Sequence, residues 1–533
     1  RWWMLVILPV VGALAVGYIV HFIAREAKGH GVPEVMDALF RQGGRIRPRI
    51  ASAKAVASAL TIGSGGSAGT EGPIIQIGAA LGSSIGQYLH IQPRQMGIVV
   101  ACGVSAGIAA IFNAPIAGVL FALEIFLRDF SFRTFSPIVF SSVISCSVMH
   151  ALRHQDVALF EVEALRSFGY VFVGAELPLF LILGLVAALT AVLFIRLLYF
   201  TEDLADRLRI HEPFKPALGA VGLGLLGVAY AVTSGAHGMP SFFGNGYPAI
   251  EAAISAELLR MSVGTLLLLV LLKLVATCFT LGSGGSGGVF APSLLMGASL
   301  GGAFGLALNH LGVIDSSSVT AYALVGMAAL VAGTTHAPLT AIVILYEITR
   351  EPTVILPAMF ASIVATSGAR FLLRDSIYTL KLRRRGVRVD AVTDLTILRR
   401  ITASQVPYLD APVVRHDDPL QNLLEVAGRS DAVDFAVVDD EGLYQGMVTG
   451  RDVRTALLAP ESVSLLLVAE LVRSSVPTVS PSETLDVVLD KFARNDVESL
   501  PVADPDHEER LCGLITRRAV MLRYREELDR SNR

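Results

Sequence analysis

Three short motifs combine glycine with a proline placed as in the first turn of a helix. They are GHGVP at residues 29–33, GTEGP at residues 69–73 and GVFAP at residues 288–292. Proline at the first helical positions costs no backbone hydrogen bond, and the glycines let backbone N–H groups face a ligand. A helix N-terminus carries about half a positive charge, so the motifs predict an anion-binding site. The candidate anion-binding residues are Gly29, His30, Gly31, Val32, Gly69, Thr70, Gly72, Gly288, Val289, Phe290 and Ala291.

Glu71 is the one acid within these motifs. Its carboxylate comes directly at a predicted helix N-terminus, where the dipole that would hold an anion also holds the carboxylate. The acid and an anion would therefore compete for one place. The alternative is an ordinary acid in a capping arrangement at the start of its own helix.

The segments that must position these residues occur twice in the chain. Residues 63–86 return as residues 282–305 with half of the aligned positions identical, and residues 103–125 match residues 326–348. Interrupted apolar segments at equivalent places in two repeats indicate a transporter whose binding site lies at the repeat interface.

The composition places most of the chain in a membrane. Hydrophobic residues make up 53% of the chain, charged residues 17%, and the mean hydropathy is +0.60. The apolar runs at residues 2–24, 177–200 and 262–280 approach the roughly 20 residues of a spanning helix. Residues 114–126 and 288–308 are shorter or rich in glycine, and we expect buried or partial spans there.

These features predict an all-α polytopic membrane domain over residues 1–380, built from two inverted repeats with broken helices. The halves cover about residues 1–155 and 165–380. The four cysteines show no CxxC or metal-ligand spacing, so we expect neither a disulfide framework nor a metal site. The apolar region lacks a nucleophile–base arrangement in its sequence, and we do not expect an enzyme.

The rest of the chain has the composition of a soluble α/β region. A basic cluster opens a linker at residues 381–400, and by the positive-inside tendency it places the following region in the cytoplasm. Two similar units, at residues 401–460 and 465–528, alternate β-rich runs such as 435–438 and 511–515 with amphipathic helical sequence. These units resemble a tandem pair of CBS domains. The basic cluster consists of Lys381, Arg383, Arg384, Arg385 and Arg388.

The order of the motifs resembles the CLC family of chloride channels and proton/chloride exchangers. The chain runs through GHGVPE, GSGGSAGTEGP and GSGGSGGVFAP to a tyrosine, Tyr378, in RDSIYTL after the last membrane segment. The resemblance implies a homodimer in the lipid bilayer, with one pathway for chloride or a similar small anion in each subunit. It also implies a multi-pass protein of the plasma membrane, here expected to be a bacterial inner membrane. It implies no required cofactor and no nucleic-acid partner.

By position, the resemblance makes Glu71 the gating glutamate, whose carboxylate occupies an anion site when ionised and swings away when protonated or displaced. The central site would use the backbone amides of Val289 and Phe290 with the hydroxyl of Tyr378. The alternative for Tyr378 is an aromatic residue at the membrane interface. His30 stands where many members have a chloride-binding serine, and it either donates a hydrogen bond to the anion or turns away.

Exchangers of this family commonly carry an inner, proton-relaying glutamate where this chain has Ile125. An isoleucine binds no proton, which favours passive, channel-like flow; the alternative is a proton-coupled exchanger. Glu124 is the remaining candidate for a proton pathway. Its repeat mate is Glu347, and the pairing favours a shared structural task, such as accepting backbone hydrogen bonds.

CBS pairs often hold adenine nucleotides, with a threonine near the phosphates and an aspartate three residues later on the ribose. The first unit has Thr449 and Asp452, whereas the second has Thr516 but Ala519 in place of the aspartate. The pair is therefore either a nucleotide site with one intact cleft or a ligand-free regulatory pair. CBS pairs also accompany magnesium transporters, but helix N-termini around the single acid Glu71 would repel Mg²⁺.

Overall fold

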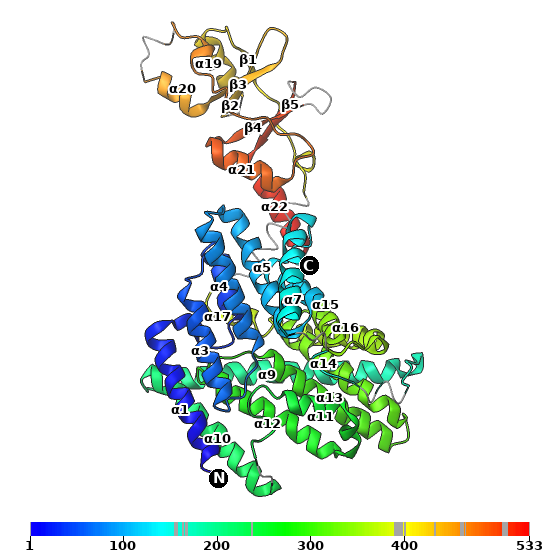
Figure 1. Ribbon diagram of the computed structural model, residues 1–533. Coiled ribbons are helices and arrows are strands. Elements are labelled where there is room, and N and C mark those ends of the chain that lie inside the picture. Colours follow the sequence, from blue (N-terminus) through cyan, green and yellow to red (C-terminus); the bar gives the residue numbers. More distant parts are fainter. Residues whose placement is uncertain are drawn as a thin grey trace. The chain divides into compact units, whose positions relative to one another are not determined.

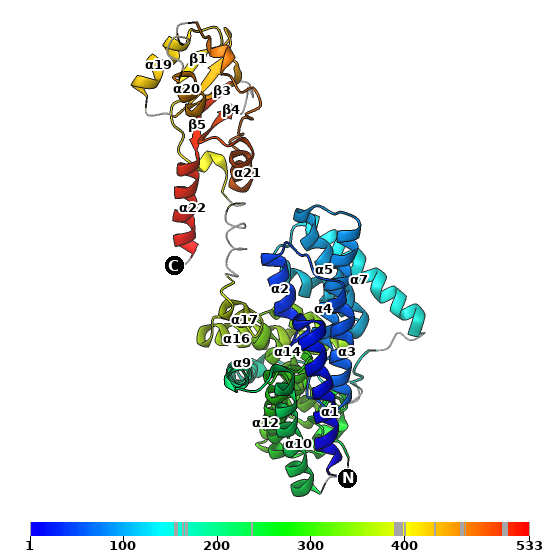
Figure 2. The ribbon, with the colours of Figure 1, turned by 90° about the vertical axis from the view of Figure 1, so that its left-hand side faces the viewer.

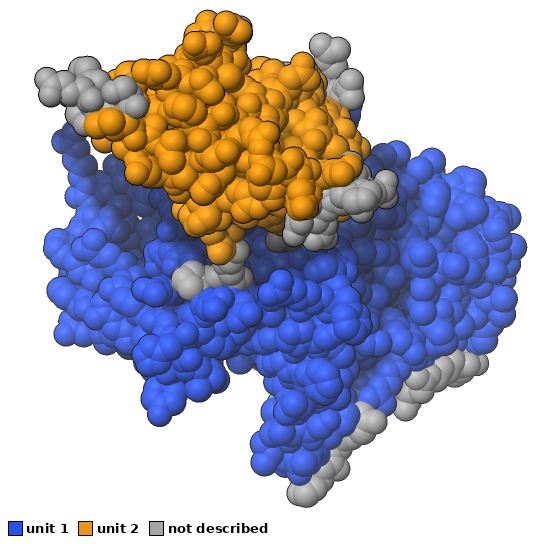
Figure 3. All heavy atoms as spheres, turned by 90° about the horizontal axis from the view of Figure 1, so that it is seen from above, with its two compact units in different colours: residues 1–387 blue, residues 388–533 orange. Residues whose placement is uncertain are grey.

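A computed structural model describes residues 2–153, 158–162, 165, 169–235, 238–387, 398, 401–430, 433–458, 463, 465–503 and 510–531. The chain divides into two compact units, Arg1–Val387 and Arg388–Arg533, which are coloured separately in Figure 3. We refer to them as unit 1 and unit 2.

Unit 1 is helical, and one order of elements occurs in it twice. The first half contains α1 (Met4–Tyr18), α2 (Val32–Arg41), α3 (Arg49–Gly63), α4 (Glu71–Tyr88), α5 (Pro93–Phe112), α6 (Pro115–Phe121) and α7 (Phe132–Arg153). The second half contains α10 (Lys215–Ser234), α11 (Tyr247–Ile254), α12 (Val263–Gly282), α13 (Phe290–His310), α14 (Val319–Thr335), α15 (Pro338–Thr349) and α16 (Ile355–Leu372). α9 (Leu177–Arg207) lies between α7 and α10 in the chain, within the predicted second half, and α17 (Thr379–Arg384) ends the unit (Figure 1).

Equivalent helices of the two halves make equivalent contacts. α4 packs on α5 and α5 on α7, as α13 packs on α14 and α14 on α16; α1 packs on α3 as α10 packs on α12 (Figure 2). The amide of Ser67 donates to the hydroxyl of Thr280 at 3.0 Å, and that of Ser286 donates to the hydroxyl of Thr61 at 3.3 Å. Each half gives and receives the same bond, as a two-fold axis requires.

The two halves are inverted relative to each other. Lys28, which follows α1, lies 3.5 Å from the carboxylate of Asp206, and Lys215, the first residue of α10, lies 4.0 Å from the same carboxylate. A Cβ on Gly17, in the last turn of α1, would lie 2.0 Å from the carbonyl oxygen of Pro213, just before α10, so the end of α1 lies beside the start of α10. This arrangement confirms the predicted inverted repeat.

Nine helices within the described residues are long and apolar enough to cross a membrane. Met4–Ile23, Gly174–Arg207 and Val263–Gly282 cover the three runs predicted to span. The run at residues 114–126 forms the short helix Pro115–Leu127, as expected.

Of the two alternatives expected for residues 288–308, a buried or a partial span, the structure confirms the buried one. The glycine-rich run at residues 288–308 is buried, but it forms α13, whose 21 residues are long enough to cross. Its glycines do not break the helix because they serve close packing. A Cβ on Gly301 would lie 2.1 Å from the carbonyl oxygen of Tyr322 in α14, so glycine lets the two backbones touch.

Unit 2 contains two small α/β modules. In the first, β1 (Val413–Arg415), β2 (Asp434–Val438) and β3 (Tyr444–Thr449) form a sheet in that order, with α19 (Leu420–Arg429) and α20 (Gly450–Ala456) beside it. β1 and β2 are parallel, and β2 and β3 are antiparallel. In the second, β4 (Ser499–Ala503) pairs antiparallel with β5 (Leu511–Thr516), with α21 (Leu485–Asn495) and α22 (Arg517–Ser531). β2 and β5 confirm the two predicted β-rich runs.

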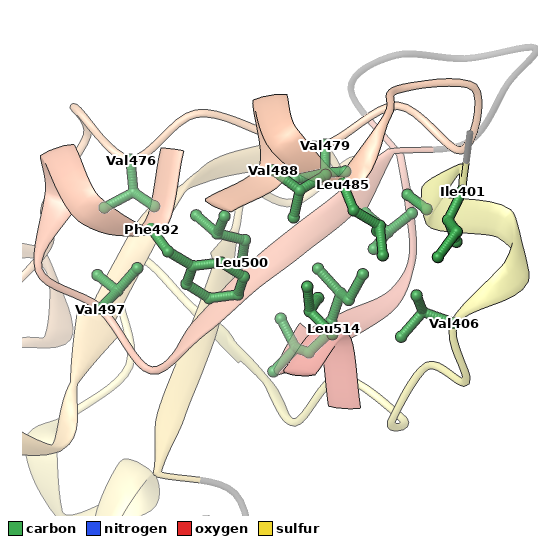
Figure 4. Packing of buried hydrophobic residues seen from close by; sticks show 14 of the residues in the cluster. Ile401, Val406, Val476, Val479, Leu485, Val488, Phe492, Val497, Leu500 and Leu514 are labelled. Carbon is green, nitrogen blue, oxygen red and sulfur yellow. The ribbon is translucent and has the colours of Figure 1, made fainter. Parts of the chain in front are cut away.

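The two modules share contacts and form one body. Ile401 and Val406, at the start of the first predicted unit (401–460), pack in the core of the second module (Figure 4). The carboxylate of Asp434, at the start of β2, accepts a hydrogen bond from the amide of Ser499 in β4 at 2.8 Å. The other labelled core residues are Val476, Val479, Leu485, Val488, Phe492, Val497, Leu500 and Leu514.

The predicted basic cluster spans the boundary between the two units in the sequence. Lys381, Arg383 and Arg384 belong to α17, and Arg385 caps its C-terminus. The first residues of the predicted linker at 381–400 therefore lie in unit 1. Arg388 and the rest of residues 388–397, together with 399 and 400, lie outside the described residues.

Candidate functional site

The three predicted motifs meet at one place in unit 1. The amide of Gly29 donates to the carbonyl oxygen of Gly285 at 3.0 Å, and that of Gly287 donates to the carbonyl oxygen of Gly29 at 3.2 Å. Gly69 and Gly288 exchange both backbone hydrogen bonds, at 2.8 and 2.6 Å. The loops of the two halves are therefore bonded to each other through their backbones.

Each motif begins a helix. α2 starts at Val32, α4 at Glu71 and α13 at Phe290, and the motif proline lies in the first turn of each helix. This confirms the prediction that the apolar segments are interrupted. Because the first N–H groups of a helix have no partner within it, three sets of amides are available around the joined loops.

A narrow cavity lies among these helix N-termini. Its volume is about 10 Å³, which is room for about one water-sized particle. The cavity is lined by His30, Val32, Glu71, Gly72, Ile75, Ile108, Phe112, Phe121, Val289, Phe290, Ile344 and Tyr378. The predicted residues that adjoin the cavity without lining it are Ala291, in the first turn of α13, and the loop residues Gly29, Gly31, Gly69, Thr70 and Gly288.

The carboxylate of Glu71 crosses to the N-terminus of α13, in the other half of unit 1. Its Oε2 accepts a hydrogen bond from the amide of Ala291 at 3.4 Å, and its Oε1 accepts one from the hydroxyl of Tyr247 at 2.9 Å. The carboxylate lies against the bridge between Gly69 and Gly288. A Cβ on Gly69 would lie 2.0 Å from Oε2 of Glu71, and a Cβ on Gly288 would lie 3.2 Å from it. The absence of a side chain at position 69 therefore makes room for the carboxylate.

His30 is buried and lines the cavity. Its Nε2 lies 3.4 Å from the hydroxyl of Tyr199, which itself donates to the carbonyl oxygen of Ile377. Within the part of the chain that the structure describes, the other ring nitrogen, Nδ1, is buried without a partner. The ring centroid lies 5.9 Å from that of Tyr378 on the same cavity. One nitrogen of His30 is thus available to a bound group.

The sequence analysis missed a fourth motif, GNGYP at residues 244–248. It shares the pattern G-x-G-x-P with GHGVP, and it starts α11 at Tyr247 as GHGVP starts α2 at Val32. The repeat itself is the signal that could have found it. Its contribution to the site is the hydroxyl of Tyr247 on Glu71.

A buried lysine fixes each of the two G-x-G-x-P loops. Nζ of Lys54 donates to the carbonyl oxygen of Gly29 at 2.7 Å, and Nζ of its repeat mate Lys273 donates to that of Gly244 at 2.9 Å. Both lysines have 0% exposure. The loops before α2 and α11 are therefore held by matched charge-assisted hydrogen bonds.

Glu124 and Glu347 each cap the start of a helix in the other half of unit 1. Glu124 accepts the amide of Thr340 at 2.8 Å, at the start of α15, and Glu347 accepts the amide of Ala117 at 2.7 Å, at the start of α6. The prediction that this pair accepts backbone hydrogen bonds is confirmed. Ile125, at the position of the inner proton glutamate, is buried.

Buried ion pairs anchor α17, which begins directly after Tyr378. Nζ of Lys381 lies 3.3 Å from Glu34 of α2 and 3.5 Å from Glu202 of α9, and Arg385 lies 3.0 Å from Glu34. Lys381 and Glu34 are 8% and 7% exposed. The position of Tyr378 at the cavity therefore depends on charges from α2 and α9.

In unit 2, the carboxylate predicted to bind ribose is already engaged. Asp452 accepts hydrogen bonds from the hydroxyl of Thr449 at 2.6 Å and from Arg473 at 2.6 Å. Partial burial would raise the pKa of Asp452, but the bonds from Arg473 and Thr449 outweigh it and hold that pKa below the usual range. In the second module Thr516 accepts the amide of Ala519 at 3.1 Å, without a matching carboxylate.

Comparison with known families gives matches over most of the chain. The family model described as voltage gated chloride channel matches residues 12–370, and the CBS domain model matches residues 403–459 and 468–526. A putative chloride channel protein ClcB-like of Ralstonia nicotianae is 32% identical over 387 residues, which are 72% of this chain and 86% of the relative. An H(+)/Cl(−) exchange transporter ClcA of Klebsiella pneumoniae is 33% identical, over 72% of this chain and 79% of the relative.

Solved structures agree with these matches. A slow cyanobacterial Cl⁻/H⁺ antiporter superposes with a TM-score of 0.61 at 27% identity, over 72% of this chain and 87% of the other. A eukaryotic CLC transporter superposes with a TM-score of 0.56 over 96% of this chain and 89% of the other; its identity of 21% makes it a likeness of fold alone.

Proposed function

Because this chain belongs to the voltage gated chloride channel family, we propose that it carries chloride through one pathway in each subunit of a homodimer, gated by Glu71. The chain is an integral membrane protein with a C-terminal CBS pair, and its family transports anions. The observation that carries the proposal is the Glu71 carboxylate at the N-terminus of α13, on the cavity that all three motifs line.

The gate follows from electrostatics. The carboxylate uses the positive end of α13 that would also hold a chloride, so ion and side chain exclude each other. With the carboxylate in place, the cavity has room for about one water-sized particle. A chloride passes when it displaces Glu71, or when protonation removes the charge that the dipole holds. The amides of Val289 and Phe290, the hydroxyl of Tyr378 and Nδ1 of His30 are its proposed ligands.

Passive flow is supported by the residues on the proposed proton route. Ile125 cannot carry a proton. The carboxylate of Glu124 accepts the amides of Leu339 and Thr340 and the hydroxyl of Thr340, so its two oxygens already serve the start of α15. We therefore propose channel-like conduction.

Proton-coupled exchange is the second candidate. The relatives favour it, because a curated relative at 33% identity is named an H(+)/Cl(−) exchange transporter and a structural relative at 27% identity is a Cl⁻/H⁺ antiporter. Exchange would require a proton route that avoids position 125.

One experiment on proteoliposomes tests these proposals. Wild-type protein should release chloride down its gradient, and Glu71→Gln should release it faster because a carboxamide carries no charge to hold at α13. Glu257→Gln, at an exposed acid of the same unit, is the matched control and should match the wild type. Failure of the wild type to release chloride would refute transport. Uphill proton movement driven by the chloride gradient would replace the passive mechanism with exchange.

For the CBS pair we propose a ligand-free role. The engagement of Asp452 by Thr449 and Arg473, and Ala519 in the second module, support it. Millimolar AMP, ADP or ATP should leave the melting temperature unchanged, since a ligand that binds the folded state stabilises it by mass action. A rise that depends on nucleotide concentration would contradict the proposal.

A further inference from the structure

We propose that Tyr247 is a positioning residue of the gate, whose hydroxyl holds the Glu71 carboxylate in the closed position. The inference rests on the proposed role of Glu71 and extends it to a second residue. The hydroxyl of Tyr247 donates to Oε1 of Glu71 at 2.9 Å, whereas the amide of Ala291 donates to Oε2 at 3.4 Å. The tyrosine therefore makes the shorter of these two bonds.

The loop that carries Tyr247 is held on several sides. Nζ of Lys273 donates to the carbonyl oxygen of Gly244, and the amide of Ala68, close to Glu71 in the chain, donates to the same oxygen at 3.2 Å. The ring of Phe160 packs edge-on against the ring of Tyr247, at a centroid distance of 5.5 Å. A hydroxyl delivered by so constrained a loop loses little freedom when it bonds the carboxylate.

The repeat provides an internal comparison for the hydroxyl. Val32 holds the equivalent place in GHGVP, where the same turn forms and starts α2 with an apolar side chain. Tyrosine is therefore not needed to build a G-x-G-x-P turn. Its hydroxyl has a separate task, and the partner that it bonds is the gating acid.

Tyr247 acts on the acid and not on the anion. Val32 lines the cavity, whereas Tyr247 is not among the residues that line it. The chloride competes with Glu71 for α13, and the tyrosine favours Glu71 in that competition. Loss of the hydroxyl should therefore let chloride displace the carboxylate at lower concentration.

The test compares Tyr247→Phe with the wild type in proteoliposomes, with chloride as the probe. The bond joins a hydroxyl to an ionised acceptor, so the chloride concentration for half-maximal release should fall about tenfold. Tyr170→Phe is the matched control, because the hydroxyl of Tyr170 makes a similar bond to Glu176, at 2.7 Å, away from the cavity. This control should behave as the wild type. Tyr247→Val, which takes the residue of the mate motif, is the second variant should Tyr247→Phe fail to fold.

A background without the gating acid separates positioning from a structural role. In Glu71→Ala, Tyr247→Phe should have no further effect, because the carboxylate that the hydroxyl holds is gone. An equal shift in both backgrounds, or no shift in the wild-type background, would overturn the role of Tyr247. If Glu71→Ala itself conducts as the wild type, the proposed gate fails, which is a result distinct from either of these.

Discussion

Gly69 and Glu71 form a functional pair at the level of single residues. Gly69 makes two backbone hydrogen bonds with Gly288. The side chain of Glu71, two residues later, passes over Gly69 to reach the N-terminus of α13. The Glu71 side chain has room to take this path because residue 69 has no side chain. A substitution there therefore acts on the gate without altering the acid.

Gly69→Ala should open the gate. Its Cβ would lie 2.0 Å from Oε2 of Glu71 and 3.1 Å from the Cβ of Ala291, and the flexible carboxylate is the atom group able to move. We expect chloride release as fast as that of Glu71→Ala. Gly63→Ala is the control, because a Cβ at that position meets no atom within 4 Å. Wild-type release from Gly69→Ala would show that the carboxylate position does not limit flow.

Glu124→Gln tests the capping role against the proton role. A carboxamide accepts at one oxygen and loses the charge that favours a helix N-terminus, so the free energy of unfolding should fall by about 1 kcal/mol. Glu347→Gln should show the same loss in denaturant unfolding, since it caps α6 as Glu124 caps α15. Proton movement into proteoliposomes should be the same for both variants. A change in proton movement confined to Glu124→Gln would return this residue to the proton pathway.

Much of the site could be predicted from the sequence because its parts are local. A helix start with proline and glycine is encoded within five residues, and so is an acid at that start. Tyr247 could not be predicted in the same way. Its hydroxyl reaches Glu71 across 176 positions of chain, and a tyrosine beside an apolar helix carries no local signal of such a contact.

At the level of elements, α17 is a short helix whose position depends on charge. It places Tyr378 at the cavity, and Lys381 joins it to α2 and α9 through two carboxylates. From the sequence alone, these basic residues indicated only that the region after them lies in the cytoplasm. Their pairing could not be predicted, because Glu34 and Glu202 are far from Lys381 in the chain. The run that forms α13 was expected to be a buried or a partial span, and the sequence left both open because glycine signals both helix breaks and close packing.

Lys381→Met should destabilise unit 1 and loosen α17. Removing Lys381 takes its cation from Glu202 and leaves Glu34 with Arg385 alone, so the free energy of unfolding should fall by at most about 3–5 kcal/mol. Chloride affinity should fall as well, because Tyr378 loses its support. Arg383→Gln is the control: its guanidinium is 66% exposed in a 2.8 Å pair with Asp375, which is worth at most about 1 kcal/mol. Equal losses in the two variants, by unfolding in detergent, would contradict the anchoring role.

Asp452→Ala should loosen α20. The loss of the capping box and of the pair with Arg473 should cost about 1–2 kcal/mol, which raises amide exchange in α20 about 5–30-fold. The lowered pKa of Asp452 makes its contribution present above the ordinary aspartate value of about 3.9. It is lost as the pH falls below that value, so the difference between variant and wild type should narrow there. Amide exchange in α22 is the control and should not change, because the equivalent residue there is Ala519. If the difference in α20 exchange between variant and wild type stayed the same at low pH, the charge argument would be refuted.

At the level of the whole molecule, the proposed anion site lies entirely within unit 1. All the cavity-lining residues lie before Val387, and the family model ends at residue 370. The CBS pair has its own core and its own contacts between modules. The proposed chloride pathway and the CBS pair thus belong to separate compact units.

A chain that ends after Val387 should still transport chloride. It keeps α17 and the ion pairs that place Tyr378, so release from proteoliposomes should persist and should still be accelerated by Glu71→Ala. Full-length protein reconstituted in parallel is the reference. A folded, truncated protein without chloride release would make unit 2 part of the transport machinery.

The reciprocal bonds between the halves have a consequence for how any cycle can proceed. Gly69 with Gly288, Ser67 with Thr280, and the crossed caps of Glu124 and Glu347 all link one repeat to the other. Many carriers with inverted repeats achieve alternating access by rocking one repeat against the other. Rocking here would break several buried backbone bonds at once. The proposed pathway would therefore depend on moving side chains. A covalent tether between the repeats, which would arrest a rocking carrier, should then leave chloride release unchanged.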